Sequence, residues 1–241
     1  MGRIVAVSSG DLESTEPINR YALGLISGEG RNVLFIGTAS GDAAGYVDNI
    51  EKAFSKLGCR VRDLSLTVRE YSEAELREAI RWADLIYVGG GDTIFMRNTW
   101  KRFGLDQILK DVYRNDTAVL MGISAGAICW FNCGCTDSAL AEIQDGAAYG
   151  WANDMLGIHN FAVCPHYEDR MEAFGLLMKE KDIGGLAMES NKAFVDDNGQ
   201  VCFIKSVEKA KIYRLFWEND CCTKEEVPAA LIGREGHYGT L

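Results

Sequence analysis

The chain has 241 residues, of which 47% are hydrophobic, and it carries a formal net charge of −10. This length and hydrophobic content suit an α/β domain with a large buried core and exclude an intrinsically disordered chain. The acidic balance argues against nucleic acid and anionic membranes as partners.

Eight cysteines occur without the spacing of a disulfide framework, and the first residues lack a signal-peptide pattern. No apolar stretch of the sequence is long enough for a membrane-spanning helix. We therefore expect a cytoplasmic protein with free thiols. Cys133 and Cys135 are spaced like half of a metal site, but no second pair of Cys or His ligands accompanies them. Buried thiols are the better interpretation, and we expect neither a metal nor another cofactor.

The first half of the chain alternates between strand-like and helix-like segments. Apolar, β-branched runs predict buried strands at residues 3–8, 32–39, 60–66 and 84–88. Helical periodicity predicts helices at residues 17–27, 46–57, 72–82, 94–100 and 105–114. Ser72 and Glu75 form a capping box at the start of the third of these helices.

The second half begins with a buried strand at 118–121 and a helix that follows it closely. Residues 134–155 are polar and show no clear period, and a connection of this length is usually functional. Further elements are predicted as a strand at 157–164, a helix at 167–179, a hairpin at 192–206 and a strand at 211–217. This order predicts an α/β fold in one domain, residues 1–241. Its doubly wound, mostly parallel sheet has helices on both faces and a C-terminal antiparallel hairpin.

The segment with the clearest chemistry is TAVLMGISAGAICWF, residues 117–131. Its G-x-S-x-G pattern lies between a strand and a helix, which is the setting of a nucleophile elbow. Gly122 and Gly126 would allow close backbone approach on either side of Ser124. A chance pattern in a chain with 26 glycines is the alternative, but the strand-turn-helix setting favours a nucleophile.

A serine nucleophile requires a base, and the chain has three histidines. His237 lies in a polar tail, whereas His159 and His166 lie at opposite ends of one predicted strand, roughly 23 Å apart. Functional groups of parallel sheets gather at the carboxyl ends of strands, where Ser124 and His166 both lie. His166 is therefore the candidate base, and a loop histidine that only packs against its neighbours is the alternative.

The third catalytic group should be a carboxylate near His166. Asp137 and Glu142 follow the elbow helix, and Glu168 and Asp169 lie beside the histidine. The residues alone do not choose among these four.

The oxyanion of the transition state requires backbone donors. Ala125, directly after the candidate nucleophile, supplies one N–H group. The triple glycine at 89–91 follows a strand and opens a helix, so its amides are expected at the same crevice. The alternatives are a phosphate cradle, although neither common phosphate-binding glycine pattern is present, and a tight turn without a ligand.

Three motifs resemble the peptidase E (aspartyl dipeptidase) family of serine peptidases. They are V-G-G-G-D-T at 88–93, G-I-S-A-G-A at 122–127 and P-H-Y at 165–167, in an order and spacing that agree over roughly residues 30 to 190. The resemblance implies a flavodoxin-like architecture, shared with class I glutamine amidotransferases. It also implies metal-independent hydrolysis of short peptides through an acyl-enzyme.

Mapped onto this sequence, the family's motifs imply Ser124 as nucleophile, His166 as base and Asp137 as third triad member. Cyanophycinase-like relatives would place Glu142 in the third role. The implied oxyanion donors are Gly91 and Ala125.

Substrate contacts are implied for Gly90, Asp92 and Thr93 in the glycine loop. Aspartyl dipeptidases bind the substrate carboxylate with an Arg on the helix after the catalytic His, but residues 171–182 contain none. Arg170, closer to His166, is the available substitute. A preference for N-terminal Asp is therefore doubtful for this chain.

We predict a serine-type peptidase that cleaves short peptides in the manner of a dipeptidase, as a monomer or homodimer. A cyanophycinase-like enzyme or an esterase would use the same triad. A non-catalytic binding protein, or a nucleotide-binding flavodoxin-like protein, would use only the fold.

Overall fold

Five neighbouring strands of the larger of two β-sheets are parallel, and they extend from inside the sheet to one of its edges. In spatial order they are β1 (Arg3–Val7), β5 (Val119–Ile123), β4 (Leu85–Val88), β2 (Asn32–Ile36) and β3 (Arg60–Asp63). The computed structural model describes residues 1–138 and 148–233. The strands β1, β4 and β5 are buried along their whole length, as their uninterrupted apolar sequences predict.

The predicted C-terminal hairpin joins this sheet beside β1. Strand β10 (Lys192–Asp197) pairs antiparallel with β1, and β11 (Gln200–Lys205) returns along β10. The short strand β14 (Ala230–Leu231) pairs parallel with β11 and completes the eight strands described for this sheet. The hairpin is therefore part of the main sheet.

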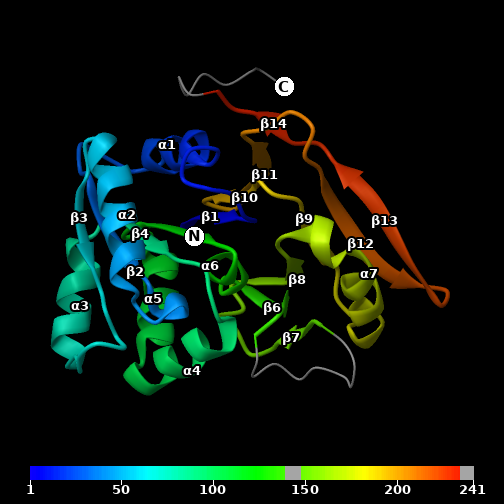
Figure 1. Cartoon of the computed structure of the whole chain (residues 1–241), viewed down its shortest axis with the longest axis horizontal. Coiled ribbons are helices and arrows are strands. Elements are labelled where there is room, and N and C mark those ends of the chain that lie inside the picture. The colour runs from blue at the N-terminus through cyan, green and yellow to red at the C-terminus, as the bar shows by residue number, and fades with distance from the viewer. Residues whose placement is uncertain (139–147, 234–241) are drawn as a thin grey trace.

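Helices cover both faces of the main sheet, as predicted (Figure 1). One face packs against α1 (Glu16–Gly24) and α2 (Ala44–Lys56). The other packs against α3 (Glu73–Trp82), α4 (Thr93–Phe103) and α5 (Leu105–Asn115). The capping box of α3 is confirmed by reciprocal hydrogen bonds between Ser72 and Glu75. A 3-10 turn, η1 (Thr38–Ser40), follows β2.

A second sheet, which the sequence did not predict, lies beside the first. Its order is β13 (Cys221–Val227), β12 (Ile212–Glu218), β9 (Gly185–Met188), β8 (His159–Cys164), β6 (Phe131–Thr136) and β7 (Gly150–Ala152). One face packs toward the α3–α5 side of the main sheet. The other is covered by α7 (Tyr167–Leu177), which Figure 1 shows, and by Met178 of the 3-10 turn η2 (Met178–Glu180).

The prediction of a polar connection at 134–155 was therefore incomplete. The segment 134–155 begins within β6 and contains the whole of β7. The sequence of β6, FNCGCT, mixes small and polar residues, and β7 has only three residues, so neither shows a clear period. Strand β6 depends on pairing with β8, and β7 depends on pairing with β6, which local sequence does not reveal.

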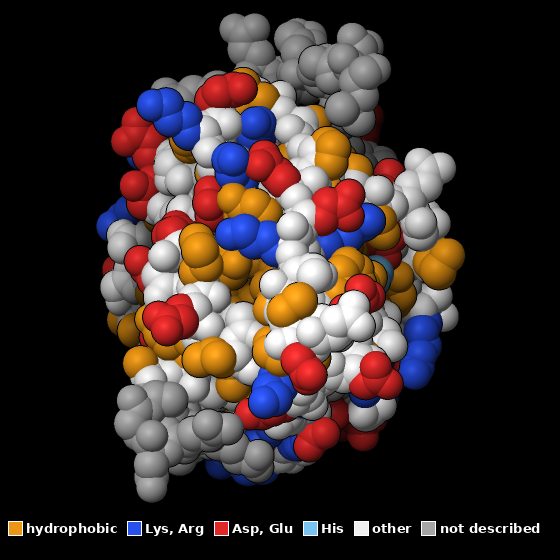
Figure 2. All heavy atoms as spheres, turned by 90° about the vertical axis from the view of Figure 1, so that its right-hand side faces the viewer, with side chains coloured by type: hydrophobic (Ala, Val, Ile, Leu, Met, Phe, Trp, Pro, Cys, Tyr) orange, Lys and Arg blue, Asp and Glu red, His pale blue; other side chains and the backbone are white. Residues whose placement is uncertain are grey.

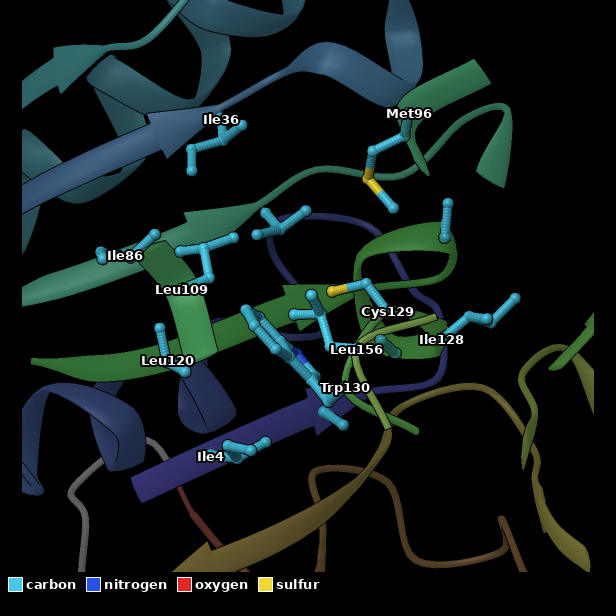
Figure 3. Close-up of a cluster of buried hydrophobic side chains, with 14 of the residues drawn as sticks. Ile4, Ile36, Ile86, Met96, Leu109, Leu120, Ile128, Cys129, Trp130 and Leu156 are labelled. Atoms are coloured by element: carbon cyan, nitrogen blue, oxygen red, sulfur yellow. The ribbon is translucent and has the colours of Figure 1, made fainter. Parts of the chain in front are cut away.

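A continuous apolar core joins the two sheets. Ile4, Ile86 and Leu120 from the main sheet face Leu109 of α5, and the fully buried Trp130 lies next to them (Figure 3). The same cluster includes residues of β8, β9 and β12 in the second sheet. This packing fixes the carboxyl ends of β1, β4, β5 and β8 relative to one another.

Acidic, basic and hydrophobic side chains are mixed over the face shown in Figure 2. Within residues 1–138 and 148–233, no helix has the combination of length and apolar composition that crossing a bilayer requires.

Candidate active site

The elbow at Ser124 has the strained backbone of a nucleophile turn. Strand β5 ends at Ile123, and Ser124 has φ 56° and ψ −114° before the short helix α6 (Ala125–Ile128) begins. A non-glycine residue in this conformation costs on the order of 1–3 kcal/mol and persists only where its surroundings hold it. Here the N–H of Ser124 donates to the carbonyls of Val7 (3.0 Å) and Ser8 (3.1 Å).

The two glycines around Ser124 are required by backbone contacts. A Cβ on Gly122 would lie 2.1 Å from the carbonyl oxygen of Gly126, and a Cβ on Gly126 would lie 2.2 Å from that of Val88. Contacts this short with backbone atoms cannot be relieved by a side-chain rotation. The expectation of close backbone approach at both glycines is confirmed, and it holds the elbow against the end of β4.

His166 lies against Ser124. It follows β8 and precedes α7, and its Nε2 is 2.9 Å from the Ser124 Oγ. Burial of the largely covered imidazole lowers the pKa of His166 below its ordinary value, and the nearby Arg170 guanidinium lowers it further. The imidazole is therefore neutral at pH 7 and can accept the hydroxyl proton.

His159 lies at the other end of β8, away from this contact. Its Nε2 is 3.2 Å from the Asp196 Oδ2, and Tyr113 donates to the same oxygen at 2.6 Å. The structure thus brings one of these two histidines to Ser124. His237 lies outside the described residues.

The four candidate carboxylates have different positions. Asp137 lies in the same cleft as His166, but its carboxylate is paired with Arg170 at 3.3 Å and its side chain is 63% exposed. Glu168 is bonded to the backbone and hydroxyl of Ser190. Asp169 lines the cleft without a bond to the imidazole. No carboxylate of residues 1–138 or 148–233 hydrogen bonds to His166, and Glu142 lies outside those residues.

One amide of the glycine loop has no acceptor in the part of the chain that the structure describes. The N–H groups of Gly89, Gly90 and Asp92 donate to Ile36 O, the Tyr46 hydroxyl and Ala39 O, respectively. Those of Gly91 and Ala125 have no acceptor within the described residues. Gly91 has φ +138°, and a Cβ there would lie 2.2 Å from Ala39 O, so the loop needs glycine at this position.

The remaining loop residues have different environments. Asp92 caps α4 by accepting from the Phe95 N–H at 2.8 Å, and its carboxylate also accepts from the Ser138 hydroxyl. Thr93 is buried, with its hydroxyl 3.2 Å from that of Thr136. Asp92 therefore faces the cleft, whereas Thr93 lies beneath the loop and supports it.

A cleft of about 580 Å³ opens over Ser124 and His166. Gly91, Asp92, Asp137, Asp169 and Arg170 form much of its wall, and Gly90 lies close enough that a Cβ would be 3.2 Å from that of Ser124. With three aspartates and one arginine, this wall carries a net negative charge.

Two cleft residues, Ser138 and Tyr149, were not identified from the sequence. Both belong to the segment that showed no periodicity, and no motif marked them. Ser8, which contacts Ser124 and His166, was also missed. Its position directly after a parallel strand is the signal that could have found it, because such positions gather at the functional edge of the sheet.

The described residues contain no group of three or more Cys, His, Asp or Glu side chains arranged to hold a metal ion. Cys133 and Cys135 are buried free thiols of β6. The chemical groups at the cleft are the Ser124 hydroxyl, the His166 imidazole, backbone amides, and the side chains of three aspartates and one arginine.

Comparison with known proteins gives a consistent result. The model of peptidase family S51 matches residues 4–204. The uncharacterized peptidase YgaJ of Bacillus subtilis is 34% identical over 244 residues, which cover 97% of this chain and 100% of that protein.

Two solved structures share the fold. A peptidase from an acI-B1 actinobacterium has a TM-score of 0.70 at 20% identity, with 95% of each chain covered. A protein of Listeria monocytogenes EGD-e, provisionally named a peptidase E, has a TM-score of 0.64 at 24% identity, with 85% of this chain and 98% of the other covered.

Proposed function

Since the chain belongs to peptidase family S51, the peptidase E family of serine-type peptidases, we propose that Ser124 is its nucleophile and His166 its general base. The observation that supports this most directly is the 2.9 Å contact between Ser124 Oγ and His166 Nε2. The strained elbow points the hydroxyl into the cleft, and the lowered pKa of His166 keeps the base neutral at pH 7.

The reaction then has two halves. His166 takes the hydroxyl proton as Ser124 Oγ attacks the peptide carbonyl, and it returns that proton to the leaving amine as the C–N bond breaks. Water, deprotonated by the same imidazole, then hydrolyses the acyl-enzyme. The N–H groups of Gly91 and Ala125, which have no acceptor within residues 1–138 and 148–233, are the proposed donors to the oxyanion in both halves.

Asp137 is the proposed third member of the triad. Its negative charge raises the pKa of His166, so it stabilises the imidazolium that forms during acyl transfer. The guanidinium of Arg170 pairs with the Asp137 carboxylate at 3.3 Å. Asp137→Asn should lower kcat strongly, whereas Glu142→Gln should have little effect. A larger loss of kcat in Glu142→Gln than in Asp137→Asn would instead assign the role of third triad member to Glu142.

We propose short peptides as substrates, without a preference for N-terminal Asp. The guanidinium of Arg170 already donates to the Cys135 carbonyl at 2.8 Å and pairs with Asp137. The cleft presents the further carboxylates Asp92 and Asp169. A substrate carboxylate would meet this acidic wall and would have to compete with Asp137 for the arginine.

A dipeptide panel tests the substrate proposal. Ala-Leu should be cleaved at least as fast as Asp-Leu, and N-blocked peptides report whether a free amino terminus is required. Strong selective turnover of Asp-Leu would contradict the proposal. Hydrolysis of esters or of cyanophycin-like polymers, without dipeptide turnover, would favour the other serine hydrolases.

A fluorophosphonate probe tests the nucleophile independently of substrate. The probe should label Ser124, and labelling should disappear in Ser124→Ala and become much slower in His166→Ala. Folding of each variant is checked by circular dichroism. Failure of the wild-type protein to react would instead support a non-catalytic binding role.

A further inference from the structure

Ser8 occupies a position that no catalytic motif marks. It follows β1 directly and is fully buried, far in sequence from both Ser124 and His166. Its hydroxyl donates to the carbonyl oxygen of Met188 at 2.6 Å and accepts from the backbone N–H of His166 at 3.0 Å. The hydroxyl therefore has a donor role and an acceptor role, and both are filled.

The backbone of the same residue holds the nucleophile. The carbonyl oxygen of Ser8 accepts from the N–H of Ser124 at 3.1 Å, alongside the carbonyl of Val7 at 3.0 Å. Ser8 thus bonds to the backbones of both Ser124 and His166. It also connects the main sheet to the second sheet through Met188 at the end of β9.

Both residues that Ser8 contacts have unusual backbone conformations. Ser124 has φ 56°, and His166 has φ 53° and ψ 40°. Positive φ is uncommon in residues other than glycine, and neighbouring contacts help to hold the backbone in such a conformation. For His166, the bond from its own N–H to the Ser8 hydroxyl is such a contact, because it fixes the turn from which the imidazole projects.

We infer that Ser8 is a positioning residue, whose hydroxyl sets the distance between His166 Nε2 and Ser124 Oγ. This inference rests on the proposed roles of Ser124 and His166. Without the hydroxyl, the His166 N–H loses its acceptor and the turn before α7 is free to shift. Displacement of a catalytic group by about 1 Å costs on the order of 100-fold in rate.

Ser8→Ala isolates the hydroxyl, because alanine keeps the backbone carbonyl that binds Ser124. We expect kcat to fall by about 10- to 100-fold while KM changes by about twofold or less. Ser9→Ala is the matched control. Ser9 is also buried, and its hydroxyl is bonded to the Ser190 hydroxyl at 2.7 Å without contacting Ser124 or His166. Its kcat should stay within about twofold of wild type.

Ser8→Thr restores a hydroxyl at the same place and should recover most of the lost kcat. If Ser8→Ala does not fold, Ser8→Cys replaces it, because its thiol preserves the side-chain shape but accepts hydrogen bonds only weakly. An unchanged kcat in a folded Ala or Cys variant would overturn the inference, as would an equal loss in Ser9→Ala.

The rate of fluorophosphonate labelling distinguishes positioning from general damage. If Ser8 acts through His166, Ser8→Ala should slow labelling strongly in the wild-type background but by no more than about twofold in His166→Ala. An equal loss in both backgrounds would indicate damage to the elbow itself and would contradict the inference. Persistence of labelling in Ser124→Ala would instead refute the proposed function, whatever the Ser8 variants do.

Discussion

The surroundings of His166 determine the pH range in which the proposed base works. Burial and Arg170 lower its pKa below the ordinary value of 6.5. The imidazole is protonated, and therefore inactive as a base, below that lowered pKa. The acidic limb of kcat/KM against pH should accordingly have its midpoint below 6.5. A midpoint above 6.5, measured with a substrate that does not itself titrate there, would contradict this expectation.

Removing either of two neighbouring charges should shift the midpoint of this acidic limb, and the two shifts should have opposite signs. Arg170→Met removes a cation that lowers the pKa of His166, so the midpoint should rise. Glu168→Gln removes an anion that raises the pKa, so the midpoint should fall, while the amide oxygen can still accept from Ser190. Shifts of the same sign in both variants would show that repacking, rather than charge, controls the titration.

At the scale of elements, the elbow depends on contact between α6 and the end of β4. In Gly126→Ala the new methyl group would lie 2.2 Å from the carbonyl oxygen of Val88, so α6 must move away from the glycine loop. We expect a loss of about 1–3 kcal/mol in the free energy of unfolding and loss of fluorophosphonate labelling at Ser124. Urea denaturation measures the first quantity and mass spectrometry the second.

Gly175→Ala provides the matched control for this substitution. Gly175 lies inside α7, and a Cβ there would meet no atom within 4 Å. Alanine should stabilise the helix by about 0.5–1 kcal/mol and leave labelling unchanged. If both variants lost stability equally, the cost would not come from the contact with Val88.

At the scale of the whole molecule, Lys192 is a buried charge in the main sheet. It is fully buried at the start of β10, and its Nζ has no hydrogen-bond partner within the described residues. Burial, together with the ammonium of cross-strand Lys205, lowers the pKa of Lys192 to about 8. Lys192→Met should raise the free energy of unfolding at pH 7 by on the order of 1–3 kcal/mol.

The effect of this substitution should depend on pH. Between pH 8 and the ordinary pKa of 10.5, the unfolded chain holds a proton at Lys192 that the folded protein has lost. Stability rises with pH in that window, so the destabilisation by Lys192 is complete below pH 8 and is progressively relieved above it. The stability difference between Lys192→Met and wild type, from urea denaturation, should therefore be smaller at pH 9.5 than at pH 7. An equal stability difference at the two pH values would contradict the lowered pKa of Lys192.

We expect the two sheets to unfold together. The core cluster that contains Ile4 and Trp130 includes residues of both sheets, so neither sheet can lose its packing alone. Thermal unfolding followed by tryptophan fluorescence and by far-UV circular dichroism should give coincident transitions. Two separate transitions would show that residues 1–241 do not behave as a single domain.

The sequence by itself determined the parallel half of the fold and singled out the two residues that we propose as the reactive pair. Uninterrupted apolar strands, helical periodicity, the capping box at Ser72 and the elbow glycines are local signals, because each reflects a conformation that neighbouring residues set. The small number of histidines then singled out His166 as the partner of Ser124. These two residues come together because both follow the carboxyl end of a strand.

Only the tertiary structure decided the rest. The second sheet depends on pairing between distant strands of weak sequence pattern. Strand β6 is defined by its pairing with β8, and β7 by its pairing with β6. Three further contacts also join residues far apart in the chain. They are the ion pair of Asp137 with Arg170, the contact of the Thr93 and Thr136 hydroxyls beneath the glycine loop, and the hydrogen bond from the His166 N–H to the Ser8 hydroxyl. Sequence periodicity reports which face of an element is buried, but it does not report which distant side chain or backbone group meets that face.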